Sequence, residues 1–220
     1  MHAGIYYKPN SLKAKVCIDG SKRLINWAEK KGIQINKCGK VISPSSIELD
    51  KQIDKLYERG RLNGADVEII DEKKFKKIIP DGRTASGRAL WSPNTAVINP
   101  RTVLHKLKDE LLSKDVKFIL GSKKQFFDKK LQKVVINEKT NIFYKHLINC
   151  AGLHADKIAH NFDVGLNYKL LPFRGLYWKL KKNIKLNLKT NLYPVPDLKM
   201  PFLGVHFTPS AQINPSNVSI

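Results

Sequence analysis

The sequence predicts a folded protein of the mixed α/β (α+β) class. Amphipathic segments with apolar residues at helical spacing alternate with short apolar runs that turn residues separate. The hydrophobic content of 42% over 220 residues is enough for a packed core. Several of the apolar runs follow one another directly, which is typical of antiparallel hairpins rather than of strictly alternating strands and helices.

The predicted elements begin and end at recognisable signals. Ser11 is a suitable N-cap for a helix that Gly32 would end, and Asp71 caps a brief helix that stops before Pro80. Helices are expected at 12–31, 47–63, 72–79 and 101–113 and directly after Gly152. Strands are expected at 33–42, 67–70, 116–120, 124–127, 133–136, 141–149, 176–180, 191–195, 202–207 and 218–220, whereas 81–100 is expected to be loop-rich.

The net charge of +21 suggests a polyanionic partner at first sight. The lysines are spread over helix faces and hairpins, however, and are not gathered with stacking aromatic residues or on an arginine-rich helix. We therefore expect no specific nucleic-acid partner, and only non-specific binding of polyanions at low salt.

Three cysteines, Cys17, Cys38 and Cys150, are odd in number and lack metal-ligand spacing, so we expect buried free thiols and no metal site. The first residues have neither the basic region nor the apolar region of a signal peptide. No apolar run reaches the roughly 18 residues that span a bilayer. A cytoplasmic location is therefore expected.

The segment 147–156 carries the most chemical information. An apolar strand runs directly into Ala151-Gly152 and then into the start of a helix. Small residues let a ligand approach the backbone there, and the free N–H groups of a helix start can bind a phosphate. The alternative interpretation is a tight turn between a strand and a helix with no ligand.

Six segments together resemble one family, and they cover nearly the whole chain. They begin with His-Ala-Gly-Ile-Tyr-Tyr-Lys-Pro at 2–9 with Ser-Leu-Lys-Ala at 11–14, and Ala-Leu-Trp-Ser-Pro at 89–93. They continue with Asn-Cys-Ala-Gly-Leu-His-Ala-Asp at 149–156, Pro-Phe-Arg-Gly at 172–175, Tyr-Pro-Val-Pro-Asp at 193–197 and Pro-Phe-Leu-Gly-Val-His-Phe-Thr at 201–208. In this order and spacing the chain is similar to the L-2-hydroxyglutarate dehydrogenase/oxidase family, among the D-amino-acid-oxidase-like flavoproteins.

The resemblance implies a partial Rossmann-type FAD lobe and a substrate lobe built on an antiparallel sheet. The FAD lobe would take about 1–40 and 97–160, and the substrate lobe about 41–96 and 161–220. The chain has no Gly-x-Gly-x-x-Gly segment for the FAD diphosphate. The resemblance therefore also implies an internal portion of one oxidoreductase domain, incomplete at both termini.

The implied reaction moves a hydride from the α-carbon of a 2-hydroxy acid to the flavin, and it needs a base for the hydroxyl proton. By the resemblance His206 is the first candidate for the base and His2 the second. Arg174 suits a bidentate clamp on a substrate carboxylate. The alternatives are a core histidine for His206, a frayed chain end for His2 and an ordinary ion pair for Arg174.

Further roles follow from the same resemblance. Tyr6, Tyr7 and Tyr193 would donate hydrogen bonds to the substrate, with plain aromatic packing as the alternative. The cofactor would be bound by Gly4, beside the flavin ring, by Ala151 and Gly152 on the diphosphate or adenosine side, and by Lys124, where the family prefers a small apolar residue.

The resemblance implies FAD-dependent oxidation of L-2-hydroxyglutarate to 2-oxoglutarate, with the 220-residue chain alone expected to be inactive. A sister flavoenzyme for glycerol 3-phosphate or an amino acid is one alternative. A non-catalytic basic fragment is the other. The electron acceptor, quinone or oxygen, stays open. For a quinone-linked enzyme, the lysines would suit peripheral association with the inner membrane face.

We expect the 220-residue chain alone to bind FAD weakly or not at all, because the diphosphate has no glycine-rich cradle in it. Flavin absorbance at about 450 nm in the purified chain measures this. A stoichiometric yellow protein would show that the expectation is wrong.

Overall fold

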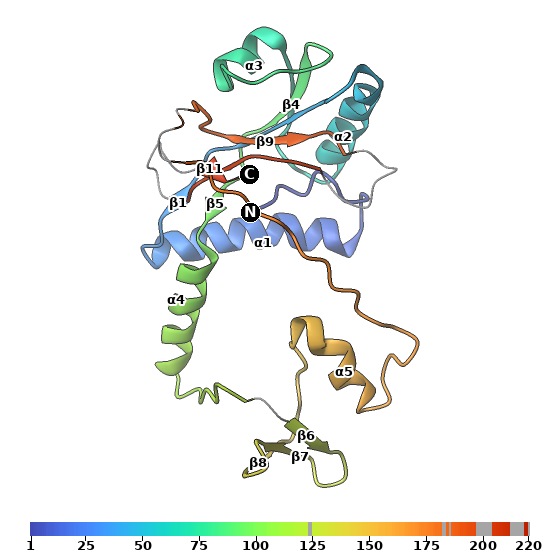
Figure 1. Ribbon diagram of the computed structural model, residues 1–220, viewed down its shortest axis with the longest axis vertical. Helices are drawn as coiled ribbons and strands as arrows, with labels where there is room; N and C mark the ends of the chain where they lie inside the picture. The colour runs from blue at the N-terminus through green and yellow to red at the C-terminus, as the bar shows by residue number, and fades with distance from the viewer. Residues whose placement is uncertain (123–124, 182–183, 185, 197–203, 212–217, 220) are drawn as a thin grey trace. The chain divides into compact units, whose positions relative to one another are not determined.

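The computed structural model describes residues 1–122, 125–181, 184, 186–196, 204–211 and 218–219. The chain forms two compact units, one of residues 1–111 with 177–220 and one of residues 112–176. Helices and sheets occur in both units, so the mixed α/β class is confirmed (Figure 1). Among the described residues, no helix combines the length and the apolar character needed to cross a bilayer.

The first unit is built on a four-stranded sheet in the order β3-β4-β2-β9. The strands are β2 (Lys40–Ser43), β3 (Glu68–Asp71), β4 (Arg88–Ser92) and β9 (Asn191–Pro194). β4 runs antiparallel to both β2 and β3, whereas β9 runs parallel to β2. The sheet is therefore mostly antiparallel, with one parallel strand that arrives from the far end of the sequence.

Each face of this sheet buries its own apolar cluster, because successive side chains of a strand point to opposite faces. One cluster combines Val41 and Ala89 of the sheet with Phe75. The other combines Ile42 and Leu90 with side chains of a helix and of the chain start. The second cluster matters for the site, because Ile5 and the partly buried Tyr6 belong to it.

The helices of this unit follow the predicted signals. α1 (Leu12–Lys30) begins at Ser11, whose Oγ accepts a hydrogen bond from the Ala14 N–H at 3.2 Å. α3 (Glu72–Ile78) begins at Asp71, whose side chain accepts from the Lys74 N–H at 2.7 Å. The other elements are η1 (Ile47–Leu49), α2 (Lys51–Leu62), α4 (Pro100–Leu112), the β1 (Ile35–Asn36) and β5 (Val97–Ile98) pair, and the β10 (Thr208–Pro209) and β11 (Val218–Ser219) pair.

The second unit holds a three-stranded antiparallel sheet and one short helix. The strands β6 (Gln125–Asp128), β7 (Lys133–Ile136) and β8 (Thr140–Phe143) pair in sequence order. A 3-10 turn, η2 (Gly152–His154), leads into α5 (Ala155–His160). The expected helix after Gly152 is thus confirmed, although it is short.

Residues 81–100 are rich in loop, as expected, although β4 within them lies between two partner strands. Four expected strand segments were wrong. Residues 116–120 and 144–149 form no strand: the described residues of their unit supply no neighbouring ladder, and Ile148 is 82% exposed. Residues 176–178 and 204–206 are likewise irregular, whereas the prediction at 202–203 lies outside the described residues.

The cysteines are free, as expected, but not buried: Cys17 and Cys38 are half-buried and Cys150 is exposed. The reason is that none of the three belongs to either apolar cluster. The predicted division into an FAD lobe and a substrate lobe does not coincide with the two compact units, and it stays a prediction.

Gly39 offers a test of how β2 is positioned. Its φ is +68°, and a Cβ there would lie 2.1 Å from the Trp91 ring. Gly39→Ala therefore adds a steric overlap to the roughly 1–2 kcal/mol that left-handed backbone costs other residues. Urea unfolding should show a larger loss of unfolding free energy than for Gly32→Ala, whose φ is +66° with open space around it. Equal losses would contradict this packing.

Candidate functional site

The start of β2 directs one lysine into the interior of the first unit. The Gly39 N–H donates to the Thr95 carbonyl at 2.8 Å, and the Asn191 side-chain amide donates to the Gly39 carbonyl at 2.6 Å. These bonds hold Gly39 between the chain that follows β4 and the start of β9. The next residue, Lys40, pairs with Ser92 on one side and with Asn191 on the other.

Lys40 is 1% exposed, which is unusual for a lysine. Its Nζ lies 3.4 Å from His2 Nδ1, 5.2 Å from the centre of the Tyr6 ring and 4.5 Å from the centre of the Tyr193 ring. Burial lowers the pKa of Lys40 to about 8. Within the described residues, no carboxylate forms an ion pair with it. The site is therefore a buried cation enclosed by imidazole and aromatic rings.

The loop at the start of the chain reaches this lysine because α2 fixes it. The Arg59 guanidinium donates to the Tyr6 carbonyl at 3.0 Å, and the Asn63 amide donates to the carbonyls of Gly4 and Tyr7, both at 2.9 Å. Gly4 has a φ of +79° and packs against α1 at Ile18. The loop backbone is therefore bonded on one side and packed on the other.

The Tyr6 hydroxyl is buried, and no described group forms a hydrogen bond with it. Burial is also the main cause that raises the pKa of Tyr6, so this hydroxyl stays protonated at neutral pH. A protonated hydroxyl without a partner can donate a hydrogen bond to a ligand. Together with the Lys40 ammonium it gives the site two donor groups.

The two candidate histidines occupy different hydrogen-bonding situations. His2 Nδ1 faces the Lys40 ammonium, which can only donate, so Nδ1 accepts and the proton of the neutral ring sits on Nε2. His206 Nδ1 faces the Gly204 carbonyl at 3.2 Å, which can only accept, so its proton sits on Nδ1 and Nε2 is left with a lone pair.

Electrostatics separates the two rings further. The pKa of His2 is lowered to about 4, first by burial and then by the charge of Lys40. His2 is therefore neutral at pH 7, although the residue as a whole still presents surface to solvent. His206 is half-buried and packs on Tyr193 with ring centres 4.3 Å apart and planes tilted by 38°.

The structure thus brings four of the predicted residues together with Lys40: His2, Tyr6, Tyr193 and His206. We call these five residues the Lys40 cluster. Gly4 and Tyr7 belong to the same loop as His2 and Tyr6. Tyr7 is half-buried and carries the Lys13 ammonium 4.8 Å from its ring centre. Its predicted contact with substrate stays a prediction.

The remaining predicted residues lie in the second unit. Gly152 has a φ of +55° at the start of η2, and the Ala151 N–H donates to the Asn149 side chain at 3.3 Å. Gly152 and Arg174 are exposed. Lys124 lies outside the described residues. The meeting of Ala151, Gly152 and Arg174 with His206 around one ligand stays a prediction.

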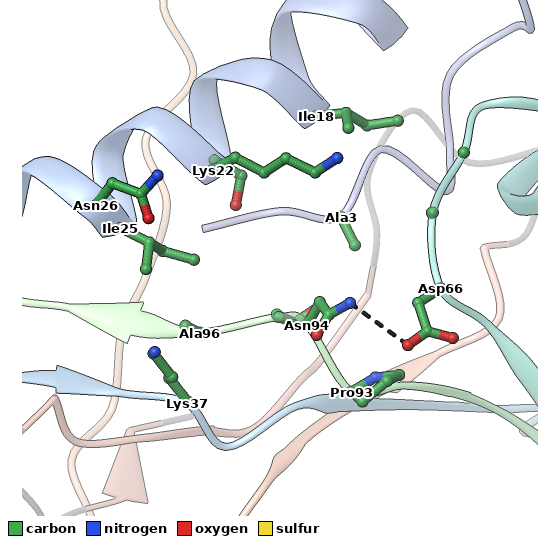
Figure 2. A pocket seen from close by; sticks show the side chains of 14 residues that line it. Ala3, Ile18, Lys22, Ile25, Asn26, Lys37, Asp66, Pro93, Asn94 and Ala96 are labelled. Carbon is green, nitrogen blue, oxygen red and sulfur yellow. Dashed lines mark hydrogen bonds between the residues drawn. The ribbon is translucent and has the colours of Figure 1, made fainter.

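A cavity of about 360 Å³ lies elsewhere in the first unit, between α1 and the turn before β5 (Figure 2). Ile18, Lys22 and Ile25 of α1 form one wall. On the other side Asn94 donates to Asp66 at 3.4 Å. His2, Tyr6, Tyr193 and His206 do not line it. Polar and apolar residues of no shared chemistry line this cavity, so it adds nothing to the Lys40 cluster.

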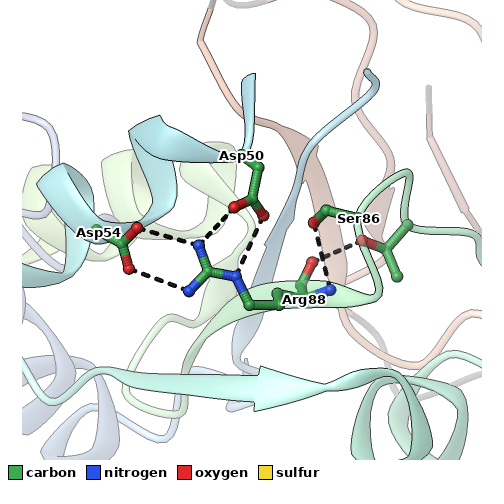
Figure 3. Close-up of polar contacts among 5 residues, drawn as sticks. Asp50, Asp54, Ser86 and Arg88 are labelled. Carbon is green, nitrogen blue, oxygen red and sulfur yellow. Dashed lines mark hydrogen bonds and ion pairs between the residues drawn. The ribbon is translucent and has the colours of Figure 1, made fainter. Parts of the chain in front are cut away.

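Arg88, in the same unit, is a cation whose charge is balanced by carboxylates. The Arg88 guanidinium binds Asp50 at 2.6 and 3.2 Å and Asp54 at 3.0 and 3.2 Å (Figure 3). Its hydrogen bonds lower the pKa of the Asp50 carboxyl. This group ties β4 to the start of α2 and is structural. Lys40, by contrast, has buried charge without a described counter-ion.

Lys40 was missed by the sequence interpretation, which placed the lysines on surfaces. One signal was present: Lys40 shares a strand face with the apolar Ile42, so alternation predicts an inward side chain at position 40.

Comparison with known proteins agrees with the geometry. The family model "FAD dependent oxidoreductase" matches residues 1–214. L-2-hydroxyglutarate dehydrogenases are similar: the mitochondrial protein of Caenorhabditis briggsae is 36% identical over 95% of this chain and 50% of its own length. The Homo sapiens mitochondrial protein is 33% identical over 95% and 48%. The chain spans about half the length of the curated relatives it matches.

Solved structures show the same fold. A dithionite-reduced L-alpha-glycerophosphate oxidase from Mycoplasma pneumoniae with FAD bound superimposes with a TM-score of 0.78 at 20% identity, over 100% of this chain and 58% of that one. A glycine oxidase from Geobacillus kaustophilus gives a TM-score of 0.75 at 12% identity, over 99% and 57%. Because the family model matches residues 1–214 of the 220, this chain belongs to the FAD dependent oxidoreductase family.

Proposed function

We propose that the protein to which these residues belong oxidises L-2-hydroxyglutarate, or a closely related 2-hydroxy acid, with FAD as cofactor. The relatives named L-2-hydroxyglutarate dehydrogenase are 33–36% identical over 94–95% of this chain. The observation that carries the proposal is the Lys40 cluster, because a buried cation with adjacent donors suits an acidic substrate.

The cluster fits the flavin-ring end of FAD. The ring is flat and largely apolar, and the Tyr6 and Tyr193 rings beside Lys40 offer aromatic surface to it. A Cβ at Gly4 would meet Ile18 at 2.8 Å, so the loop packs closely where the resemblance puts the ring. Bound FAD would supply the hydride acceptor. Gly4, Tyr6 and His2 are the residues of this chain that would lie along the ring.

His206 is the better candidate for the base. Oxidation of a 2-hydroxy acid releases the hydroxyl proton as the α-hydrogen leaves as hydride. The lone pair on His206 Nε2 can take that proton, and the resulting imidazolium would be held by the Gly204 carbonyl on Nδ1. His2 instead offers an N–H on Nε2, so it can hydrogen bond to a substrate oxygen. We therefore assign His2 to binding.

We keep the role of Arg174 as a second group that binds a substrate carboxylate. We also keep the role of Ala151 and Gly152 in binding the diphosphate or adenosine side of FAD. The electron acceptor, quinone or oxygen, and a peripheral location at the inner membrane face are parts of the proposal that rest on the resemblance alone.

The activity is tested on the gene product that contains these 220 residues, with FAD and an artificial dye as electron acceptor. L-2-Hydroxyglutarate should reduce the dye and yield 2-oxoglutarate, whereas the D-enantiomer should not. Glycerol 3-phosphate and glycine serve as the rival substrates. Faster turnover of either would replace the proposed substrate, and no turnover of any of them would favour a non-catalytic protein.

The base is tested by His206→Gln, which keeps the size of the side chain but cannot take the proton. We expect kcat to fall by about 10²-fold or more, because loss of a general base typically costs that much. His2→Gln is the matched comparison and should act mainly on KM. Steady-state kinetics of both variants decide the assignment, and a larger loss of kcat for His2→Gln would reverse it.

A further inference from the structure

Lys40 is buried at a cost that the described fold does not compensate. An ammonium taken out of water loses hydration that only an opposite charge or several hydrogen bonds restore. Another lysine of this unit has a counter-ion, since Lys74 Nζ contacts Glu68 at 2.6 Å. Lys40 has His2 Nδ1 as its one described hydrogen-bond acceptor, at a long 3.4 Å.

The aromatic rings around Lys40 do not satisfy the hydrogen-bonding capacity of its ammonium. An ammonium has three N–H groups, and one of them faces His2. The Tyr6 and Tyr193 rings lie 5.2 and 4.5 Å from Nζ, which allows cation–π attraction but no hydrogen bond. The buried Tyr6 hydroxyl also lacks a described partner. Two neighbouring residues thus present donors without acceptors.

The missing partner is an anion rather than a neutral acceptor. In a low-dielectric interior a carbonyl oxygen satisfies an N–H but leaves the positive charge in place. A carboxylate supplies both the acceptor oxygens and the opposite charge. The anion would lie near the base, because the centre of the Tyr193 ring is 4.5 Å from Lys40 Nζ and 4.3 Å from the centre of the His206 ring.

We propose that Lys40 binds a carboxylate of the acidic substrate, with the Tyr6 hydroxyl as a second donor to the same anion. This inference rests on the proposed function, and it names the residue of this chain that selects a 2-hydroxy acid over an uncharged alcohol. Lys40 holds the substrate, and His206 takes the proton.

The test uses the complete gene product and the variants Lys40→Met, Tyr6→Phe and Lys37→Met. Lys37 is the control, because its side chain is 60% exposed and its ammonium pairs with Glu29 at 2.6 Å. Losing a hydrogen bond from a charged group weakens binding by about 10- to 100-fold. We expect KM for L-2-hydroxyglutarate to rise by that factor in Lys40→Met, by a smaller factor in Tyr6→Phe and not at all in Lys37→Met.

Two further readouts keep the outcomes distinct. Binding of glutarate, a dicarboxylate that cannot be oxidised, is measured by calorimetry, and FAD content by absorbance. Glutarate binding lost in Lys40→Met with FAD retained supports the inference even if the wild-type protein oxidises no hydroxy acid, in which case only the proposed function fails. Unchanged glutarate affinity in Lys40→Met overturns the inference that Lys40 binds the carboxylate. Loss of FAD from this variant with glutarate affinity intact overturns the same inference.

Stability gives an independent check. Because the uncompensated charge disappears, Lys40→Met should melt at the same temperature as the wild type or higher. If the variant does not fold, Tyr6→Phe decides, because it removes one hydroxyl and keeps the ring; unchanged glutarate affinity there contradicts the inference.

The pH profile should carry the signature of Lys40. The groups that face it are His2, Tyr6, Tyr193 and the Met1 amine, with Cys17 acting on its charge. Its pKa of about 8 means that the free protein loses this positive charge as pH rises through that value. We expect kcat/KM to fall above about pH 8 and Lys40→Arg to shift that fall upward. A profile that is the same in both would contradict the assignment.

Discussion

The site depends on one energetic constraint, a positive charge held inside a sheet. Lys40 leaves solvent because Gly39 is fixed by Thr95 and Asn191, and because β2 lies between two strands. The fold bears the cost of that burial and surrounds the charge with rings that neither neutralise it nor expose it. Such a charge is available to an anion, which we propose is the substrate carboxylate near His206.

The scaffold explains why residues from both ends of the sequence meet. β9 pairs in parallel with β2, which brings Tyr193 and, through Tyr193, His206 to the start of the chain. α2 bonds the loop of Gly4 and Tyr6 to the same face. The apolar cluster under this face then packs Ile5 and Ile42 together. Packing of the core and assembly of the site are consequently one process.

Local signals in the sequence were sufficient for the helices. Ser11 and Asp71 predict their helices because a cap acts within three residues. β4 was mistaken for loop because its strand character comes from partners on both sides rather than from its own pattern. Lys40 was missed for a similar reason, since its burial depends on residues 38 positions before it and 153 positions after it. The resemblance supplied His2, Tyr6, Tyr193 and His206, which the structure groups.

The most direct measurement is the pKa of Lys40 itself. It is obtained from an NMR titration of the labelled ε-carbon of Lys40 in the complete protein, with and without glutarate. The account predicts a pKa near 8 in the free protein and a clear rise when glutarate binds, because a carboxylate at the ammonium stabilises its charged form. A Lys40 signal that titrates at the same pH with and without glutarate, while glutarate is bound, would contradict the account.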